Sequence, residues 1–246
     1  MSAMEQFWPM MPVVFGAFFL KAMTGFGAAI IMVSLGAMFL PVQEVVPLCI
    51  CLDLLAGLAL MRKDWSPGTY KYWGPLSVAM GMGAGAGALV LSRVDPSSMK
   101  LAIGAIVLGL GVWLWATRAR AAGERAVPQT PQPAAFLTTT VAGFCGGLFG
   151  ISGPPIVWFF GSRFAKADFR RVVVPLFIVA SATSLVVYAL TGLLDAQTLL
   201  RVLWCLPCWG AGLFLGGRAF ARVPEERFGQ LMAVILCAVG LKMLVF

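Results

Sequence analysis

A serine flanked by glycines is the first candidate for chemistry in this sequence. Gly150-Ile151-Ser152-Gly153 forms a G-x-S-G pattern that could present a serine nucleophile. A serine hydroxyl needs a base to activate it, and the sequence contains no histidine. Lys21 is a conceivable base, but nothing in the spacing places it beside Ser152. We therefore expect no enzymatic activity, and an intramembrane serine hydrolase is the alternative.

The backbone of the same stretch suggests a different use. Glycine tolerates a sharp turn, and Pro154 and Pro155 suit the first positions of a new helix, where amide hydrogens have no partner. A helix that begins there points free N–H groups and the positive end of its dipole at the break, which favours an anion. Gly25-Phe26-Gly27 predicts a similar break in the first half. Two such tips that converge near the membrane midplane would form an anion site, and the alternative is that these glycines only allow close helix packing.

Polar side chains near the breaks complete the candidate site. Lys21 lies one turn before the first break and would neutralise an anion, unless it snorkels to the membrane surface. Asp53 and its counterpart Ser181 are candidates for coupling to a proton or sodium, and Asp53 pairing with Lys21 is the alternative. Thr24 and Ser152 would donate hydroxyl groups. The predicted substrate-binding residues are Lys21, Thr24, Gly25, Phe26, Gly27, Gly150, Ile151, Ser152, Gly153, Pro154 and Pro155.

The composition predicts that these residues lie inside a membrane. The chain is 60% hydrophobic and 11% charged, whereas a soluble domain carries about twice that charge. The apolar runs are too long for a globular core, so we expect an all-α polytopic membrane protein. A single helix over residues 7–40 would be about 50 Å long, against a hydrocarbon core of about 30 Å. The spans are predicted at 7–40, 45–62, 70–92, 98–118, 134–162, 171–192, 198–218 and 227–246, with 7–40 and 134–162 each broken into two short helices.

The six cysteines do not predict a disulfide framework, because most fall inside predicted spans. Cys205-Leu206-Pro207-Cys208 has C-x-x-C spacing, but buried cysteine is usually a small apolar residue. We expect no metal and no cofactor.

The two halves of the chain share the same order of features. "GFGAAII" from Gly25 matches "ISGPPIV" from Ile151 at an offset of 126, and the glycine-rich run 81–87 matches 210–217 at a similar offset. A basic, proline-containing stretch separates them. We therefore divide the chain into repeat 1 (1–118), a cytoplasmic linker (119–134) and repeat 2 (135–246).

Loop charges predict how the repeats sit in the membrane. The net charge of +8 is concentrated in short loops, which indicates membrane orientation rather than nucleic-acid binding. If each long segment enters the membrane and returns on the same side, the basic loops are all cytoplasmic and both termini lie outside. Arg93 and Lys100 are the exceptions to this charge pattern, because they then fall in an outer loop. Each repeat is then a broken or re-entrant helix pair plus three transmembrane helices, and the repeats are inverted, a common transporter plan. The basic loops are 62–71, the linker, 161–171 and 218–227; the loops 41–46 and 193–200 contain no Lys or Arg.

The duplicated breaks "GFGAAI" and "GLFGISGPPI", the proline-led spans after them and the basic linker resemble the TauE/SafE family of sulfite exporters and related permeases. The resemblance covers nearly the whole chain, and the second motif is the more specific, because Ala28 and Ala29 stand where relatives often have glycine. It implies transport of a small sulfur-containing anion, sulfite or an organosulfonate among them. We therefore expect a multi-pass transporter of the bacterial inner membrane that works by alternating access.

Overall fold

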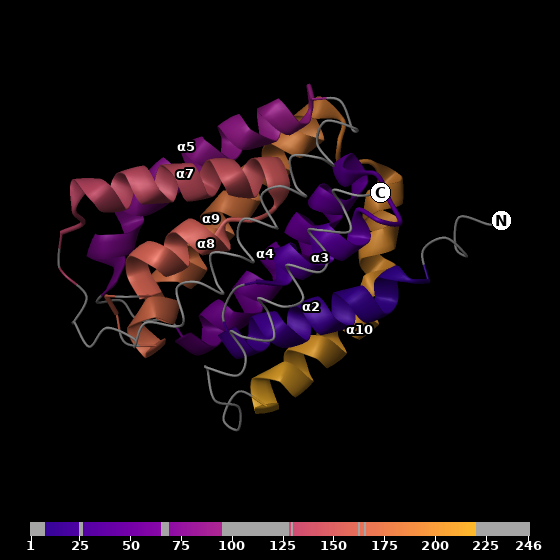
Figure 1. Cartoon of the computed structure of the whole chain (residues 1–246), viewed down its shortest axis with the longest axis horizontal. Helices are drawn as coiled ribbons and strands as arrows, with labels where there is room; N and C mark the ends of the chain where they lie inside the picture. The colour runs from indigo at the N-terminus through magenta and orange to yellow at the C-terminus, as the bar shows by residue number, and fades with distance from the viewer. Residues whose placement is uncertain are drawn as a thin grey trace. The chain divides into compact units, whose positions relative to one another are not determined.

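The computed structural model describes residues 8–24, 27–64, 69–94, 128, 130–161, 163–164 and 166–219. In these parts the regular structure is helical (Figure 1), and the chain is an all-α polytopic membrane protein, as predicted. The predicted spans 98–118 and 227–246, most of the linker, and Gly25 and Phe26 lie outside the described residues.

Four of the described helices are long and apolar enough to cross a membrane. They confirm the predicted spans at 45–62, 70–92, 171–192 and 198–218 to within a few residues. They are α4 (Val42–Asp64), α5 (Tyr70–Leu91), α9 (Lys166–Thr191) and α10 (Ala196–Ala219).

Each of the two longest predicted spans is a broken pair of helices. Residues 7–40 contain α2 (Met10–Thr24) and α3 (Ala28–Gly36). Residues 134–162 contain α7 (Pro133–Phe149), a short α8 (Gly153–Ile156) and a π-helical turn η2 (Val157–Gly161). The 15 residues of α2 rise only about 22 Å. Since the hydrocarbon core is about 30 Å thick, a helix of this length that enters from one surface ends inside the membrane.

The chain divides into two compact units, and each unit takes segments from both halves of the sequence. Unit 1 contains α2, α3, the start of α4, and nearly all of α10. Unit 2 contains the rest of α4 together with α5, α7, α8, η2 and α9. The division into repeats 1–118 and 135–246 rests on sequence similarity and stays a prediction.

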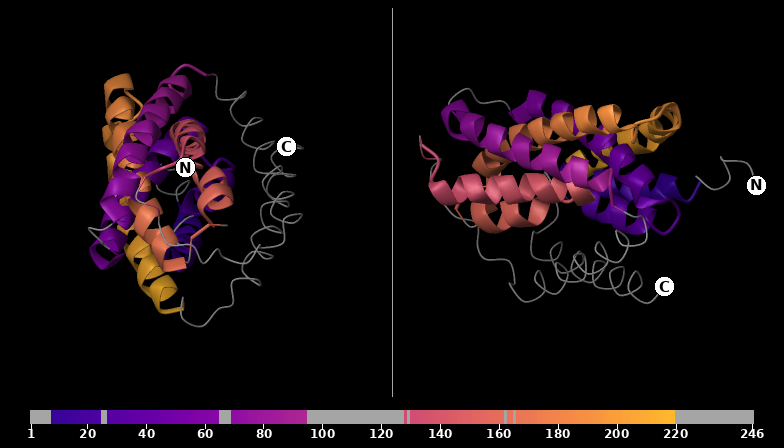
Figure 2. Two further views of the ribbon diagram at one scale, coloured as in Figure 1. Left: turned by 90° about the vertical axis from the view of Figure 1, so that its left-hand side faces the viewer. Right: turned by 90° about the horizontal axis from the view of Figure 1, so that it is seen from above.

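In unit 2, α5 and α7 lie side by side (Figure 2). Glycines bring the two helices into backbone contact. A methyl group added at Gly83 would lie 2.2 Å from the carbonyl oxygen of Thr140, and one added at Gly87 would lie 2.1 Å from that of Phe144. The contact is reciprocal, because glycines of α7 meet carbonyl oxygens of α5. Small residues allow this approach in membranes, where apolar side chains gain little from leaving lipid.

The order of the contacts shows that α5, α7 and α9 run in the same direction. Met80 and Ala84 of α5 face Gly143 and Gly147 of α7 in that order. On its other side, α5 places Gly81 against Val179 of α9 and Gly85 against Val187. The three helices therefore begin at one end of unit 2, which we call the basic end. Its cationic residues include Lys71, Arg163, Arg170 and Arg171.

Unit 1 repeats the glycine contact with different helices. A methyl group added at Gly212 of α10 would lie 2.6 Å from the carbonyl oxygen of Phe15 of α2, and one at Gly216 would lie 2.2 Å from that of Phe19. Phe18 and Trp209 also pack edge to face, with ring centroids 6.4 Å apart. In unit 2, α5 from the first half of the sequence therefore packs on α7, which precedes the second break. In unit 1, α10 from the second half packs on α2, which precedes the first break.

The starts of α2, α4 and α10 gather at one end of unit 1, which we call the Glu44 end. Gly36, at the end of α3, lies against Met10 and Val45. The amide of Gln43 donates a hydrogen bond of 3.1 Å to the carbonyl of Val94. Arg201, near the start of α10, forms an ion pair with Glu44. The charge of Arg201 at this end is thus matched by a carboxylate.

Candidate functional site

The second break is built by the turn that follows α7. Gly150 adopts a left-handed conformation (φ 74°), which glycine reaches without strain, and its N–H donates a 2.8 Å hydrogen bond to the carbonyl of Gly146. Ile151 and Ser152 form the turn itself, and α8 begins at Gly153. The six residues predicted from Gly150 to Pro155 therefore lie together in one turn inside unit 2.

Ser152 lies directly against the last turn of α7. A methyl group added at Gly146 would lie 2.0 Å from Ser152 Oγ, so this glycine makes room for the hydroxyl. The Ser152 side chain makes no capping hydrogen bond to α8, and the residue is half-buried. The hydroxyl is thus positioned by the fold without being used to cap the helix that follows it.

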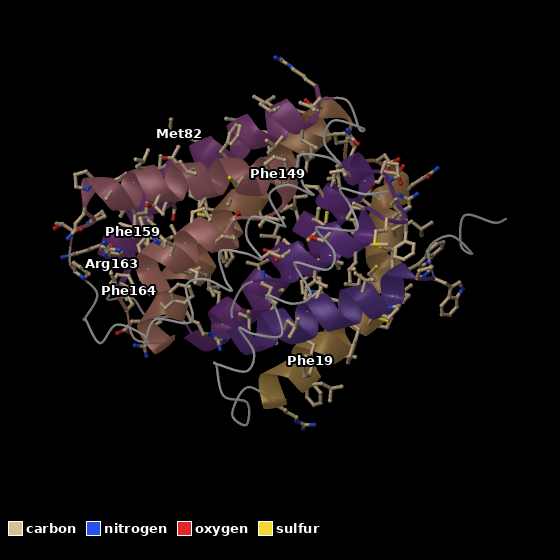
Figure 3. The ribbon with its side chains drawn as sticks, in the orientation of Figure 1. Phe19, Met82, Phe149, Phe159, Arg163 and Phe164 are labelled. Carbon is tan, nitrogen blue, oxygen red and sulfur yellow. The ribbon has the colours of Figure 1, made fainter. Side chains whose placement is uncertain are left out.

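The hairpin returns to the end of unit 2 from which it started. Tyr72, near the start of α5, packs edge to face against Phe160 and Phe164, with centroids 6.3 Å and 5.7 Å apart. Arg163 donates a 2.6 Å hydrogen bond to the carbonyl of Phe159 and stacks 3.9 Å above its ring. Figure 3 shows Phe159, Arg163 and Phe164 grouped far from Phe149, the last residue of α7. The break at Gly150 is therefore the tip of a helical hairpin in unit 2.

The first break has one feature in common with the second. Gly27 is left-handed (φ 93°) and directly precedes α3, while Thr24 is the last residue of α2. Lys21 lies in the last turn of α2 and is 2% exposed. Protein atoms therefore surround this lysine, which argues against snorkelling to the membrane surface.

The two candidates for ion coupling lie on neighbouring helices of unit 2. Ser181 of α9 is buried, and Asp53 of α4 is half-buried. A methyl group added at Gly57, one turn after Asp53, would lie 2.8 Å from Cγ1 of Ile178, one turn before Ser181. Since residues one turn apart share a helix face, the faces that carry Asp53 and Ser181 meet.

Among the described residues, no group of three His, Cys, Asp or Glu side chains could hold a metal ion. The sequence contains no histidine to activate Ser152. The chemistry that the described turn offers is therefore hydrogen bonding from backbone amides and a hydroxyl.

Two structural partners of the second break were not predicted from the sequence. Gly146 accommodates Ser152, and Tyr188 of α9 donates a hydrogen bond to the carbonyl of Gly147. Glycines and a lone tyrosine are common in membrane helices, so only the three-dimensional contact identifies these two.

Comparison with known proteins matches the chain to a protein family. The family model described as "Sulfite exporter TauE/SafE" matches residues 10–243. No curated protein and no solved structure matches the chain.

Proposed function

This chain belongs to the sulfite exporter TauE/SafE family, and on that premise we propose that it carries a small sulfur-containing anion, such as sulfite or an organosulfonate, across the membrane by alternating access. The family and the apolar helices establish a multi-pass membrane transporter. The bacterial inner membrane is the location we propose, because the chain is helical and the family exports small anions.

The observation that carries the proposal is the tip of the hairpin in unit 2. The amides of Ile151 and Ser152 precede α8 and that of Gly153 opens it, so the helix offers them no carbonyl partner. Pro154 and Pro155 have no amide hydrogen, so the first turn leaves no further donor unsatisfied. A tetrahedral or pyramidal oxyanion can accept hydrogen bonds from these amides and from Ser152 Oγ at once, and the adjacent helix end favours its charge.

At the first break we propose the same use of Gly25, Phe26 and Gly27, with Thr24 as a hydroxyl donor and Lys21 as the counter-charge. The burial of Lys21 supports this role, because an intramembrane cation is energetically expensive and is normally retained for function. Asp53 and Ser181 are our candidates for coupling transport to a proton or sodium.

The two repeats are proposed to be inverted in the membrane. The matched glycine contacts of Gly87 on Phe144 and Gly216 on Phe19 support the duplication. The hairpin in unit 2 starts and returns at the basic end, which the distribution of charged loops assigns to the cytoplasm. The helix pair in unit 1 starts and returns at the Glu44 end, whose loops carry little positive charge. The alternation of basic loops with loops that lack Lys and Arg along the sequence supports the inverted arrangement of the repeats.

Direct binding tests the proposal. Purified protein in detergent is titrated with sulfite, taurine, chloride and sodium while its melting temperature is followed. We expect sulfite or the sulfonate to raise the melting temperature at concentrations where chloride does not. Stabilisation by sodium alone would instead indicate a cation site. Covalent labelling by a serine-directed probe that is lost in Ser152→Ala would favour the serine hydrolase.

A further inference from the structure

We propose that Tyr188 is a positioning residue that fixes the tip of the second hairpin. Its hydroxyl donates a 2.5 Å hydrogen bond to the carbonyl oxygen of Gly147, across 41 residues of sequence. Tyr188 is fully buried and belongs to α9, whereas Gly147 lies in the last turn of α7. The bond therefore joins a transmembrane helix to the end of the helix that leads into the break.

The last turn of α7 has carbonyl groups that its own helix cannot satisfy. A helix leaves its final four carbonyl oxygens without an intrahelical donor, and these are costly to bury where no water reaches them. The carbonyl of Gly146 accepts the N–H of Gly150, and the carbonyl of Gly147 accepts the hydroxyl of Tyr188. Two adjacent carbonyls are thus satisfied by two different parts of the fold.

Gly147 is also fixed from the side of α5. A methyl group added at this glycine would lie 2.0 Å from the carbonyl oxygen of Ala84, so no larger residue fits between the helices. Gly147 therefore meets α5 through its α-carbon and α9 through its carbonyl. Three helices meet at one residue, one turn before the left-handed Gly150 from which the break begins.

This arrangement determines the direction in which the tip amides point. The orientation of the Ile151 and Ser152 amides depends on how α7 ends, because only the short turn after Gly150 separates them from it. Loss of the Tyr188 hydroxyl would leave the Gly147 carbonyl without this donor in an apolar environment, and the last turn would fray. The consequence for anion binding rests on the proposed function, whereas the consequence for the tip itself does not.

Hydrogen–deuterium exchange of the purified protein tests the inference. Tyr188→Phe keeps the ring and removes the hydroxyl. Thr191→Val is the matched control, because Thr191 lies on the same helix and its two described hydroxyl contacts stay within α9, with the carbonyls of Val187 and Tyr188. We expect exchange in the peptide that covers 146–156 to become about fivefold faster in Tyr188→Phe, as for the loss of one hydrogen bond, and to stay unchanged in Thr191→Val. Peptides from α5 should be unaffected in both variants.

A second measurement separates this inference from the proposed function. Sulfite affinity of the same variants should fall about fivefold in Tyr188→Phe and not in Thr191→Val. Faster local exchange with unchanged sulfite affinity would support the positioning role and contradict anion binding at the tip. Unchanged exchange over 146–156, or faster exchange spread evenly over the whole chain, would overturn the positioning role.

Discussion

Ser152 Oγ fills the space that a side chain at Gly146 would need, since a methyl group added there would lie 2.0 Å from that oxygen. Gly146→Ala should therefore displace Ser152 and weaken anion binding by about tenfold, as overpacking of this kind costs about 1–3 kcal/mol. Sulfite titration of the purified variant measures this loss.

The same contact provides a rescue. With Ser152→Gly in place, the nearest atom of residue 152 to the added methyl group is the α-carbon, at 3.9 Å, which is an ordinary contact. The double variant Gly146→Ala/Ser152→Gly should therefore bind anion better than Gly146→Ala alone. A double variant that binds no better would show that the two residues do not share this space.

Gly87 tests whether the glycine contacts hold unit 2 together. Gly87→Ala places a methyl group 2.1 Å from the carbonyl oxygen of Phe144, a backbone atom that can move only with its helix. We expect a lower melting temperature, by several degrees, with a loss of about 1–3 kcal/mol. Gly217→Ala is the control, because nothing lies within 4 Å of that position and alanine favours the helix. Equal melting temperatures for the two variants would contradict the packing described here.

Lys21 tests the charge at the first break. Lys21→Met should weaken anion binding by about one to two orders of magnitude, because a charge-assisted contact is lost. Lys21→Arg, which keeps the charge, should bind more tightly than Lys21→Met. Lys71→Met is the control for loss of a positive charge, since Lys71 is exposed at the basic end. A well-folded Lys21→Met variant with normal affinity would assign the lysine a structural role.

The distribution of charged loops predicts the membrane orientation. In a cysteine-free background, Pro128→Cys in the linker should resist an impermeant thiol reagent applied to intact cells, because the linker is expected in the cytoplasm. Ala196→Cys, which is exposed where α10 begins, should react with it. Labelling of Pro128→Cys from outside would contradict the inverted arrangement.

The sequence was sufficient to predict the family, the all-α class and the broken hairpins, because these depend on local signals. Long apolar runs predict spans, and glycine followed by Pro154-Pro155 predicts a helix end and a new start. The location of Lys21 in the last turn of its helix was also foreseen. The glycine run 81–87 was visible as a repeated feature, and its contacts with α7 show that it serves helix packing.

The partners of these features could not be predicted, because membrane helices are apolar on faces that meet protein and on faces that meet lipid. Sequence periodicity therefore does not reveal that Gly87 faces Phe144, or that Tyr188 reaches Gly147. The pair of Glu44 and Arg201 joins residues 157 positions apart and carries no local signal.

Transport by reconstituted protein tests most directly the claim that backbone groups at the second break bind the anion. Uptake of labelled sulfite into proteoliposomes is compared for Ser152→Ala and Gly153→Val. Ser152→Ala should retain substantial transport, because losing one neutral hydrogen bond costs about 1 kcal/mol. Gly153→Val should abolish it, since Gly153 is buried at the start of α8 and a β-branched side chain there blocks the approach to the amides. Complete loss in Ser152→Ala with normal transport in Gly153→Val would contradict the account.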